Sequence, residues 1–197
     1  FVLDNGAFTA WKGGAAVDVA GFVEWCLEWY RHPGFDWALI PDVIDGNEEQ
    51  NDALIQAWPK HIPGAPVWHL HESLDRLESL CSNWRTVALG SSGQFKTPGT
   101  AGWWSRMSEA MSVACDDMGR PKCRLHGLRM LDPEIFGKLP LSSADSTNAA
   151  VNSGSLSRFG MYKPPTISVR YARGYDFVGG AAVVAKHMKA AGADVDF

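Results

Sequence analysis

Short apolar runs alternate with longer amphipathic stretches along most of this chain, and this alternation constrains the fold more than any other feature. The runs have the length of single strands, and the stretches between them have the i, i+3, i+4 spacing of helices. We expect strands over 1–8, 37–43, 65–71, 86–91, 122–128 and 141–145. Six strands that alternate with helices or loops in about 150 residues predict a parallel α/β fold.

The amphipathic stretches predict helices with recognisable ends. We expect helices over 17–30, 48–58, 74–81, 101–118 and 132–137, and beyond them a strand over 158–163 and a terminal helix over 181–191. Asn47 and Ser73 stand directly before two of these helices and are typical N-cap residues. Pro59 is expected to end the helix that Asn47 begins.

Two parallel architectures fit this order, a doubly wound sheet and a (β/α)8 barrel. No GxGxxG motif or P-loop follows the first strand, which argues against a nucleotide-binding doubly wound fold. Polar or small residues end nearly every expected strand: Asp4, Asp42, His69, His71, Gly90, Ser91, His126 and Asp145. In a barrel these ends face one mouth, where active sites are built.

We therefore expect one TIM-like (β/α)8 barrel domain over 1–197. Only six or seven of its eight strands are found in the sequence. Either the barrel is incomplete, or its first strands lie upstream of Phe1.

Composition limits the classes of protein. Hydrophobic residues make up 46% of the chain and charged residues 20%, which is ordinary for a globular protein with a core. No apolar run reaches the roughly 18 residues of a membrane span, so we expect no membrane partner. The four cysteines contain no CxxC pair and there is no signal-peptide pattern, so we expect reduced thiols in the cytoplasm.

Two groups of residues raise the question of a metal. Cys115, Cys123 and His126 match no common zinc spacing. His69 and His71 alternate along one strand and so share a face, where they could bind a metal. Histidines hydrogen-bonded within an aromatic-rich interior are the favoured reading, and we expect no metal and no cofactor.

Charge is divided unevenly along the chain. The net charge is −4, but the segment 120–175 carries nine basic and three acidic residues. Such a split suggests a polyanionic partner for this segment, although a solvated surface has the same pattern. The candidate phosphate-binding residues are Arg158, Lys163, Arg170 and Arg173.

Asp4, Asp42 and Asp145 are three aspartates at expected strand ends. Partial desolvation and mutual repulsion raise and separate the pKa values of such carboxylates. Two of them suit chemistry at the anomeric carbon of a sugar, one as nucleophile and the other as general acid and base. The alternative is that each aspartate caps the turn or helix that follows it.

Five short motifs, in this order, carry a family resemblance: DNGAF (4–8), IPDVID (40–45), HLHES (69–73), LGSSG (89–93) and SADST (143–147). Together they resemble the tRNA-guanine transglycosylase superfamily, which includes relatives that insert 7-deazaguanine bases into DNA. Members are (β/α)8 barrels that exchange a guanine base for a 7-deazaguanine through a covalent aspartyl-glycosyl intermediate.

The resemblance implies a role for each matching residue. Asp145 would be the nucleophile and Asp4 the general acid and base. The base-contacting positions would be Asp42, His71, Gly90, Ser91 and Asn5.

The resemblance also implies partners, namely a nucleic acid and a free 7-deazaguanine base. The zinc-binding cysteine cluster of the family and its RNA-binding additions are absent from this sequence, so no zinc is implied, and DNA or a free nucleoside is favoured over tRNA. An N-glycoside hydrolase would use the same residues, and a non-catalytic nucleic-acid-binding barrel is the third alternative.

Overall fold

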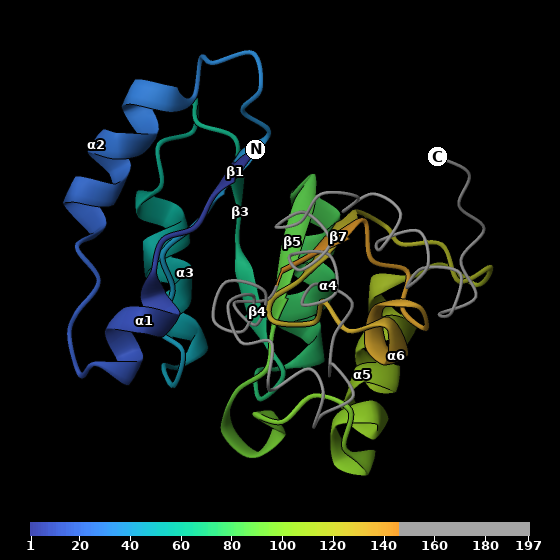
Figure 1. Cartoon of the computed structure of the whole chain (residues 1–197). Coiled ribbons are helices and arrows are strands. Elements are labelled where there is room, and N and C mark those ends of the chain that lie inside the picture. Colours follow the sequence, from blue (N-terminus) through green and yellow to red (C-terminus); the bar gives the residue numbers. More distant parts are fainter. Residues whose placement is uncertain (146–197) are drawn as a thin grey trace, which may run out of the picture. The chain divides into compact units, whose positions relative to one another are not determined.

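The computed structural model describes residues 1–145 of the chain (Figure 1). Its contacts divide the chain into two compact units, Phe1–His126 and Gly127–Phe197. The strand expected over 158–163 and the helix expected over 181–191 lie outside the described residues.

The first unit contains a parallel α/β arrangement, as the alternating pattern predicts. Its strands are β1 (Val2–Leu3), β2 (Trp37–Leu39), β3 (Gly64–Ala65), β4 (Val67–His69), β5 (Thr86–Gly90) and β6 (Arg124–Gly127), whose last residue begins the second unit. β1 pairs with β2, β2 with β3 and β4 with β5, all in parallel. The strands are shorter than expected, because polar loops begin soon after each apolar run.

Pro66 separates β3 from β4 within one extended segment. On one side of this segment, the Ile40 amide donates to the Ala65 carbonyl at 2.9 Å. On the other side, the Ala88 amide donates to the Pro66 carbonyl at 2.9 Å. The strands form two sheets, one of order β1-β2-β3 and one that begins β4-β5-β6. Since β3 and β4 lie on one extended segment, β1 to β6 follow one another in chain order across the two sheets. A doubly wound sheet instead reverses its strand order at a switch point.

The sheet of the first unit is strongly curved. The rings of Trp37 on β2 and His126 on β6 lie edge to face with their centroids 5.0 Å apart. Two strand positions, β3/β4 and β5, lie between β2 and β6. Neighbouring strands are spaced by about 4.8 Å, so in a flat sheet β2 and β6 would be about 14 Å apart. Trp37 and His126 therefore project from a concave face and meet across it.

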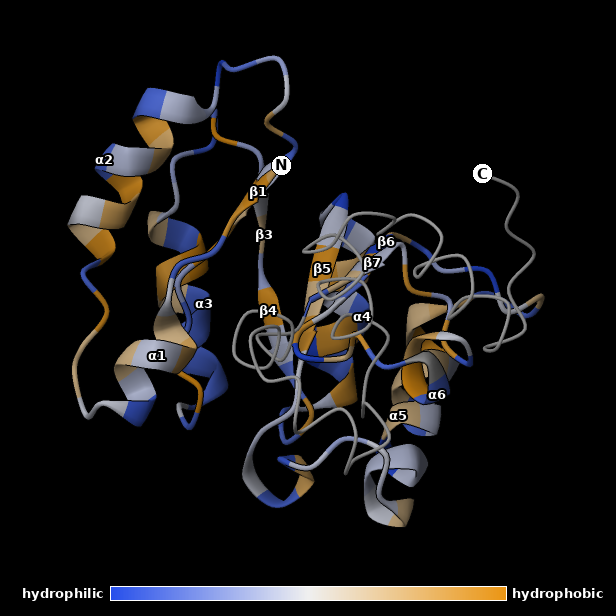
Figure 2. Cartoon of the chain, in the orientation of Figure 1, coloured by the Kyte–Doolittle hydropathy of each residue, from blue (hydrophilic) through white to orange (hydrophobic). Residues whose placement is uncertain are grey.

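Helices follow the strands and cover the other face. They are α1 (Ala7–Lys12), α2 (Val19–Trp29), α3 (Glu48–Ala57), α4 (Leu74–Asn83), the 3-10 helix η1 (Gly93–Phe95) and α5 (Ala101–Ala114). An apolar cluster lies between α2, α3 and the first two strands. Figure 2 shows the apolar character of the strands, since β1 and β4 are drawn largely in orange. The buried members of the cluster are Leu3, Phe22, Cys26, Ala38, Ile40, Trp58 and Ile62.

The predicted caps of α3 and α4 are confirmed. The Asn47 side chain accepts from the Gln50 amide at 2.9 Å, and the Gln50 side chain accepts from the Asn47 amide at 3.0 Å, which completes a capping box. The Ser73 hydroxyl accepts from the Arg76 amide at 3.2 Å.

Two element boundaries differ from the prediction for local reasons. The strand expected over 1–8 ends at Leu3, because Gly6 adopts a left-handed conformation (φ 70°) and begins α1. The helix expected over 101–118 ends at Ala114. The carboxylate of Asp116 beyond it accepts from the amides of Met118 and Arg120, which closes a turn in place of further helix.

The second unit, described as far as Asp145, contains the expected short helix and strand. They are α6 (Pro133–Phe136) and β7 (Ser143–Ala144). The Asp145 amide donates to the Gly127 carbonyl at 3.1 Å and continues the pairing of β7. Within residues 1–145, none of the helices combines the length and the apolar character needed to cross a bilayer.

Candidate functional site

Three side chains that follow consecutive strand positions converge beyond the carboxyl ends of β1, β2 and β4. The Asn5 side-chain amide donates to the Ile40 carbonyl at 3.0 Å and to Asp42 Oδ1 at 3.1 Å. The other carboxylate oxygen of Asp42, Oδ2, lies 2.8 Å from His69 Nε2. The side chains of Asp42 and His69 are 7% and 3% exposed, so this Asn–Asp–His chain is almost dry.

The hydrogen bond to Asp42 assigns the proton on His69. An ionised carboxylate only accepts hydrogen bonds, so Nε2 carries a hydrogen in this contact. Nδ1 is buried and has no hydrogen-bond partner within the part of the chain that the structure describes. The contact with Asp42 therefore fixes the orientation of the imidazole ring.

Gly90 on β5 makes room for this ring. β4 and β5 pair with His69 opposite Gly90. A Cβ at position 90 would lie 2.6 Å from His69 Nδ1. Gly90 therefore belongs to the site through the space that it leaves, a role distinct from the base contact that the resemblance implies.

His71 lies beside His69 and extends the polar cluster toward solvent. The two rings stack with centroids 5.7 Å apart and an interplanar angle of 19°. His71 Nδ1 lies 2.6 Å from the Ser92 hydroxyl, and Nε2 lies 3.1 Å from the Gly46 carbonyl. Since a carbonyl only accepts, Nε2 carries the hydrogen and Nδ1 accepts from Ser92. The two rings thus lie side by side as expected, but β4 ends at His69 and His71 lies in the turn that follows, so they do not share the face of one strand.

A cavity of about 470 Å³ opens next to His71, between the turn after β4, η1 and α5. Gln94, Phe95 and Ser105 contribute to its lining. Its volume falls in the range of small-molecule sites. Ser91 faces α5, where its hydroxyl accepts from the Trp103 indole at 2.9 Å. The loop serine that contacts His71, a candidate base-binding residue, is therefore Ser92 and not Ser91.

Asp4 is exposed at the start of the turn into α1. Its Oδ1 accepts from the Gly6 amide at 3.1 Å, which is the local capping role that the sequence left open as an alternative. The next residue, Asn5, is the buried one of the pair and reaches Asp42.

Asp145 belongs to the second unit. Its Oδ1 accepts from the amide of Arg129 at 2.6 Å, and its backbone carbonyl accepts from the Leu131 amide at 3.0 Å. The four candidate phosphate-binding residues, Arg158, Lys163, Arg170 and Arg173, lie outside the described residues.

A buried charged network beneath the site was not predicted. The side chain of Glu72 is 0% exposed and that of Arg76 is 4% exposed. Arg76 Nη1 lies 2.6 Å from Glu72 Oε2. Asn51 is also buried and donates to Glu72 Oε1 at 2.8 Å. The i, i+4 spacing of Glu72 and Arg76 was the available signal, but this spacing is common on exposed helix faces.

Residues 1–145 contain no group of three side chains suited to hold a metal ion. Cys26, Cys81 and Cys115 are buried free cysteines. Burial raises the pKa of Cys26 to about 11, so this thiol stays protonated near neutral pH.

Comparison of the chain with protein-family models, with curated proteins and with solved structures finds no significant match.

Proposed function

We propose that this chain is a base-exchanging glycosyltransferase that replaces guanine in a nucleic acid, DNA in preference to tRNA, with a 7-deazaguanine base. The observation that carries the proposal is the convergence of Asn5, Asp42 and His69, with His71 beside them, beyond the carboxyl ends of neighbouring parallel strands. In parallel α/β folds this edge is where substrates bind.

The proposed architecture is a barrel of the (β/α)8 type. Its support is the consecutive strand order together with the curvature that brings Trp37 to His126. A sheet that winds in one direction with its helices outside leaves its concave face to side chains, as in a barrel interior.

The proposed recognition of the base uses paired donors and acceptors. A guanine edge presents donors that a carboxylate accepts and acceptors that an amide or imidazole N–H satisfies. Each oxygen of Asp42 keeps a lone pair that can accept from a base, whereas the N–H groups of Asn5 and of His71 Nε2 already donate within the protein and would have to exchange partners. The cavity beside His71 provides room for a group of nucleobase size.

The proposed chemistry follows the roles that the resemblance implies. The Asp145 carboxylate attacks C1′ of the nucleotide, the bond from C1′ to N9 of guanine breaks, and Asp4 gives a proton to the departing base. The incoming base then loses its proton to Asp4 and attacks C1′, which releases Asp145.

Base exchange is tested by incubating the chain with guanine-containing duplex DNA and isotopically labelled guanine, then counting the label in the recovered DNA. A parallel reaction uses tRNA. We expect label in DNA, and about a tenfold or greater loss of rate in Asp42→Asn, because a hydrogen bond to a charged group is worth about 1.5–3 kcal/mol. Asp145→Asn should abolish exchange.

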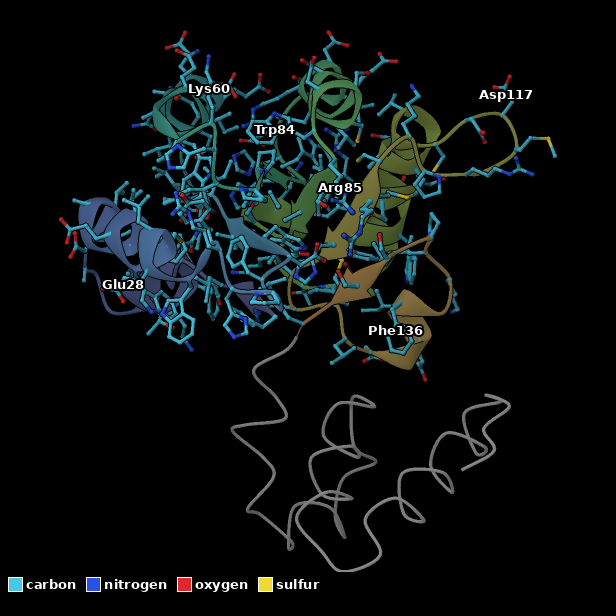
Figure 3. All side chains as sticks on the ribbon, turned by 90° about the horizontal axis from the view of Figure 1, so that it is seen from above. Glu28, Lys60, Trp84, Arg85, Asp117 and Phe136 are labelled. Atoms are coloured by element: carbon cyan, nitrogen blue, oxygen red, sulfur yellow. The ribbon has the colours of Figure 1, made fainter. Side chains whose placement is uncertain are left out.

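Asp117→Asn is the matched control, since Asp117 is an exposed aspartate on the loop after α5 (Figure 3). It should exchange base at the unaltered rate. Release of free guanine without incorporation would support the hydrolase alternative. Salt-sensitive DNA binding with neither reaction would support the non-catalytic one. Either result would contradict base exchange.

A further inference from the structure

Glu72 is a buried carboxylate that precedes α4 and accepts hydrogen bonds from three donors. Oε2 accepts from the His69 amide at 2.8 Å and from Arg76 Nη1 at 2.6 Å, and Oε1 accepts from Asn51 Nδ2 at 2.8 Å. Ser73, and not Glu72, caps the helix. The partners of Glu72 thus come from β4, from α4 and from α3.

Asn51 carries the connection onward to the loop after β2. Its Oδ1 accepts from the Val43 amide at 2.8 Å, and its Nδ2 lies 3.4 Å from the Val43 carbonyl. Val43 directly follows Asp42. The chain of contacts from Val43 through Asn51 to Glu72 and the His69 amide therefore joins the backbones that carry Asp42 and His69.

Two arginines hold the same turn from the side of the helices. Arg76 also donates to the Val67 carbonyl at 3.0 Å, and this hydrogen bond ties α4 to the first residue of β4. Arg106 on α5 donates to the carbonyls of Leu70 at 2.9 Å and Glu72 at 2.6 Å. The turn that bears His69 and His71 is thereby fixed by charged groups on both neighbouring helices.

A buried ion pair is costly to form, and apolar residues of similar volume often stabilise a fold as well or better. The partners of Glu72 on β4 and α3 suggest instead a role in fixing the geometry between these elements. We propose that Glu72 is a positioning residue that, through Asn51, holds Asp42 and His69 at hydrogen-bonding distance. The catalytic consequence rests on the proposed function, whereas the geometric one does not.

The test compares Glu72→Gln and Asn51→Ala with the unaltered full chain. Nitrogen NMR of labelled histidine follows the His69 tautomer and its hydrogen bond to Asp42, and labelled-guanine exchange gives kcat and KM. We expect the His69 signals to move in both variants. We also expect kcat to fall by about tenfold to a hundredfold while KM changes less, since a misplacement near 1 Å costs about that much.

Asp52→Asn is the matched control. Asp52 is the other carboxylate on Arg76, at 2.9 Å, but 47% of its side chain is exposed. It should leave the His69 signals and kcat unchanged. If Glu72→Gln does not fold, Asn51→Ala decides, because it keeps the pair of Glu72 and Arg76 intact.

The proposal is overturned if Asn51→Ala leaves the His69 signals in place, or if Asp52→Asn moves them equally. Absence of exchange in the unaltered chain contradicts the proposed function instead. The NMR measurement needs no substrate, so it decides the positioning role in either case.

Discussion

Gly90 is the residue at which one added methyl group would disturb the candidate site most directly. The new Cβ would lie 2.6 Å from His69 Nδ1, and neither β4 nor β5 can move without breaking its ladder. We expect Gly90→Ala to destabilise the fold by about 1–3 kcal/mol, as overpacking does. Urea denaturation measures this change.

Gly102 provides the control for Gly90. It lies in α5, and a Cβ there meets nothing within 4 Å. Gly102→Ala should raise the free energy of unfolding by up to about 1 kcal/mol, because alanine favours helix more than glycine does. Equal effects of the two substitutions would show that the ring of His69 does not depend on the space at Gly90.

At the scale of single elements, α3 depends on its first turn. It has ten residues, and Asn51 is its only fully buried one, although Ile55 packs against the apolar cluster. Asn47→Ala removes both bonds of the capping box and should lower the free energy of unfolding by about 1 kcal/mol. Thermal denaturation followed by circular dichroism measures the loss.

Gln56→Ala is the control within the same helix, since Gln56 is exposed and far from the cap. It should change stability little or raise it slightly, because alanine is the better helix former. A loss equal to that of Asn47→Ala would contradict the capping account. Since Asn51 sits on α3, fraying of this helix should also reach the contacts of Glu72.

At the scale of the whole molecule, one ion pair links distant parts of the first unit. Asp36, just before β2, lies 2.9 Å from Arg124 on β6. The hydrogen bond from Arg124 holds the pKa of Asp36 below its usual range, against a smaller opposing effect of burial. Stabilisation by this pair is therefore present above the unfolded pKa, near 4, and is lost as the pH falls through the folded pKa.

Asp36→Asn should remove this part of the acid sensitivity. Both side chains are more than a third exposed, so we expect a loss of only about 0.2–1 kcal/mol at pH 7. The difference from the unaltered chain should disappear as the pH falls through the lowered pKa of Asp36 and should shrink in 1 M salt. Urea denaturation across pH measures it, and a difference that persists at low pH would contradict the assignment.

Local signals in the sequence determined much of the fold. Alternating periodicity located the strands and most helices, because apolar spacing reports which face of an element is buried. Asn47 and Ser73 marked two helix starts, since capping is decided within one turn of the chain. The strand ends also located Asp42, His69, His71 and Gly90, which the structure brings together.

Only the tertiary structure decided which polar side chains near those strand ends turn inward. Asn5 reaches Asp42 while Asp4 faces solvent, because a left-handed Gly6 turns the chain there. Glu72, Asn51 and Arg76 form one buried network although they lie on separate elements. The i, i+4 spacing accounts for the contact of Arg76 with Glu72. The contact of Asn51 with Glu72 depends on how α3, α4 and β4 pack in space, which no spacing along the chain encodes.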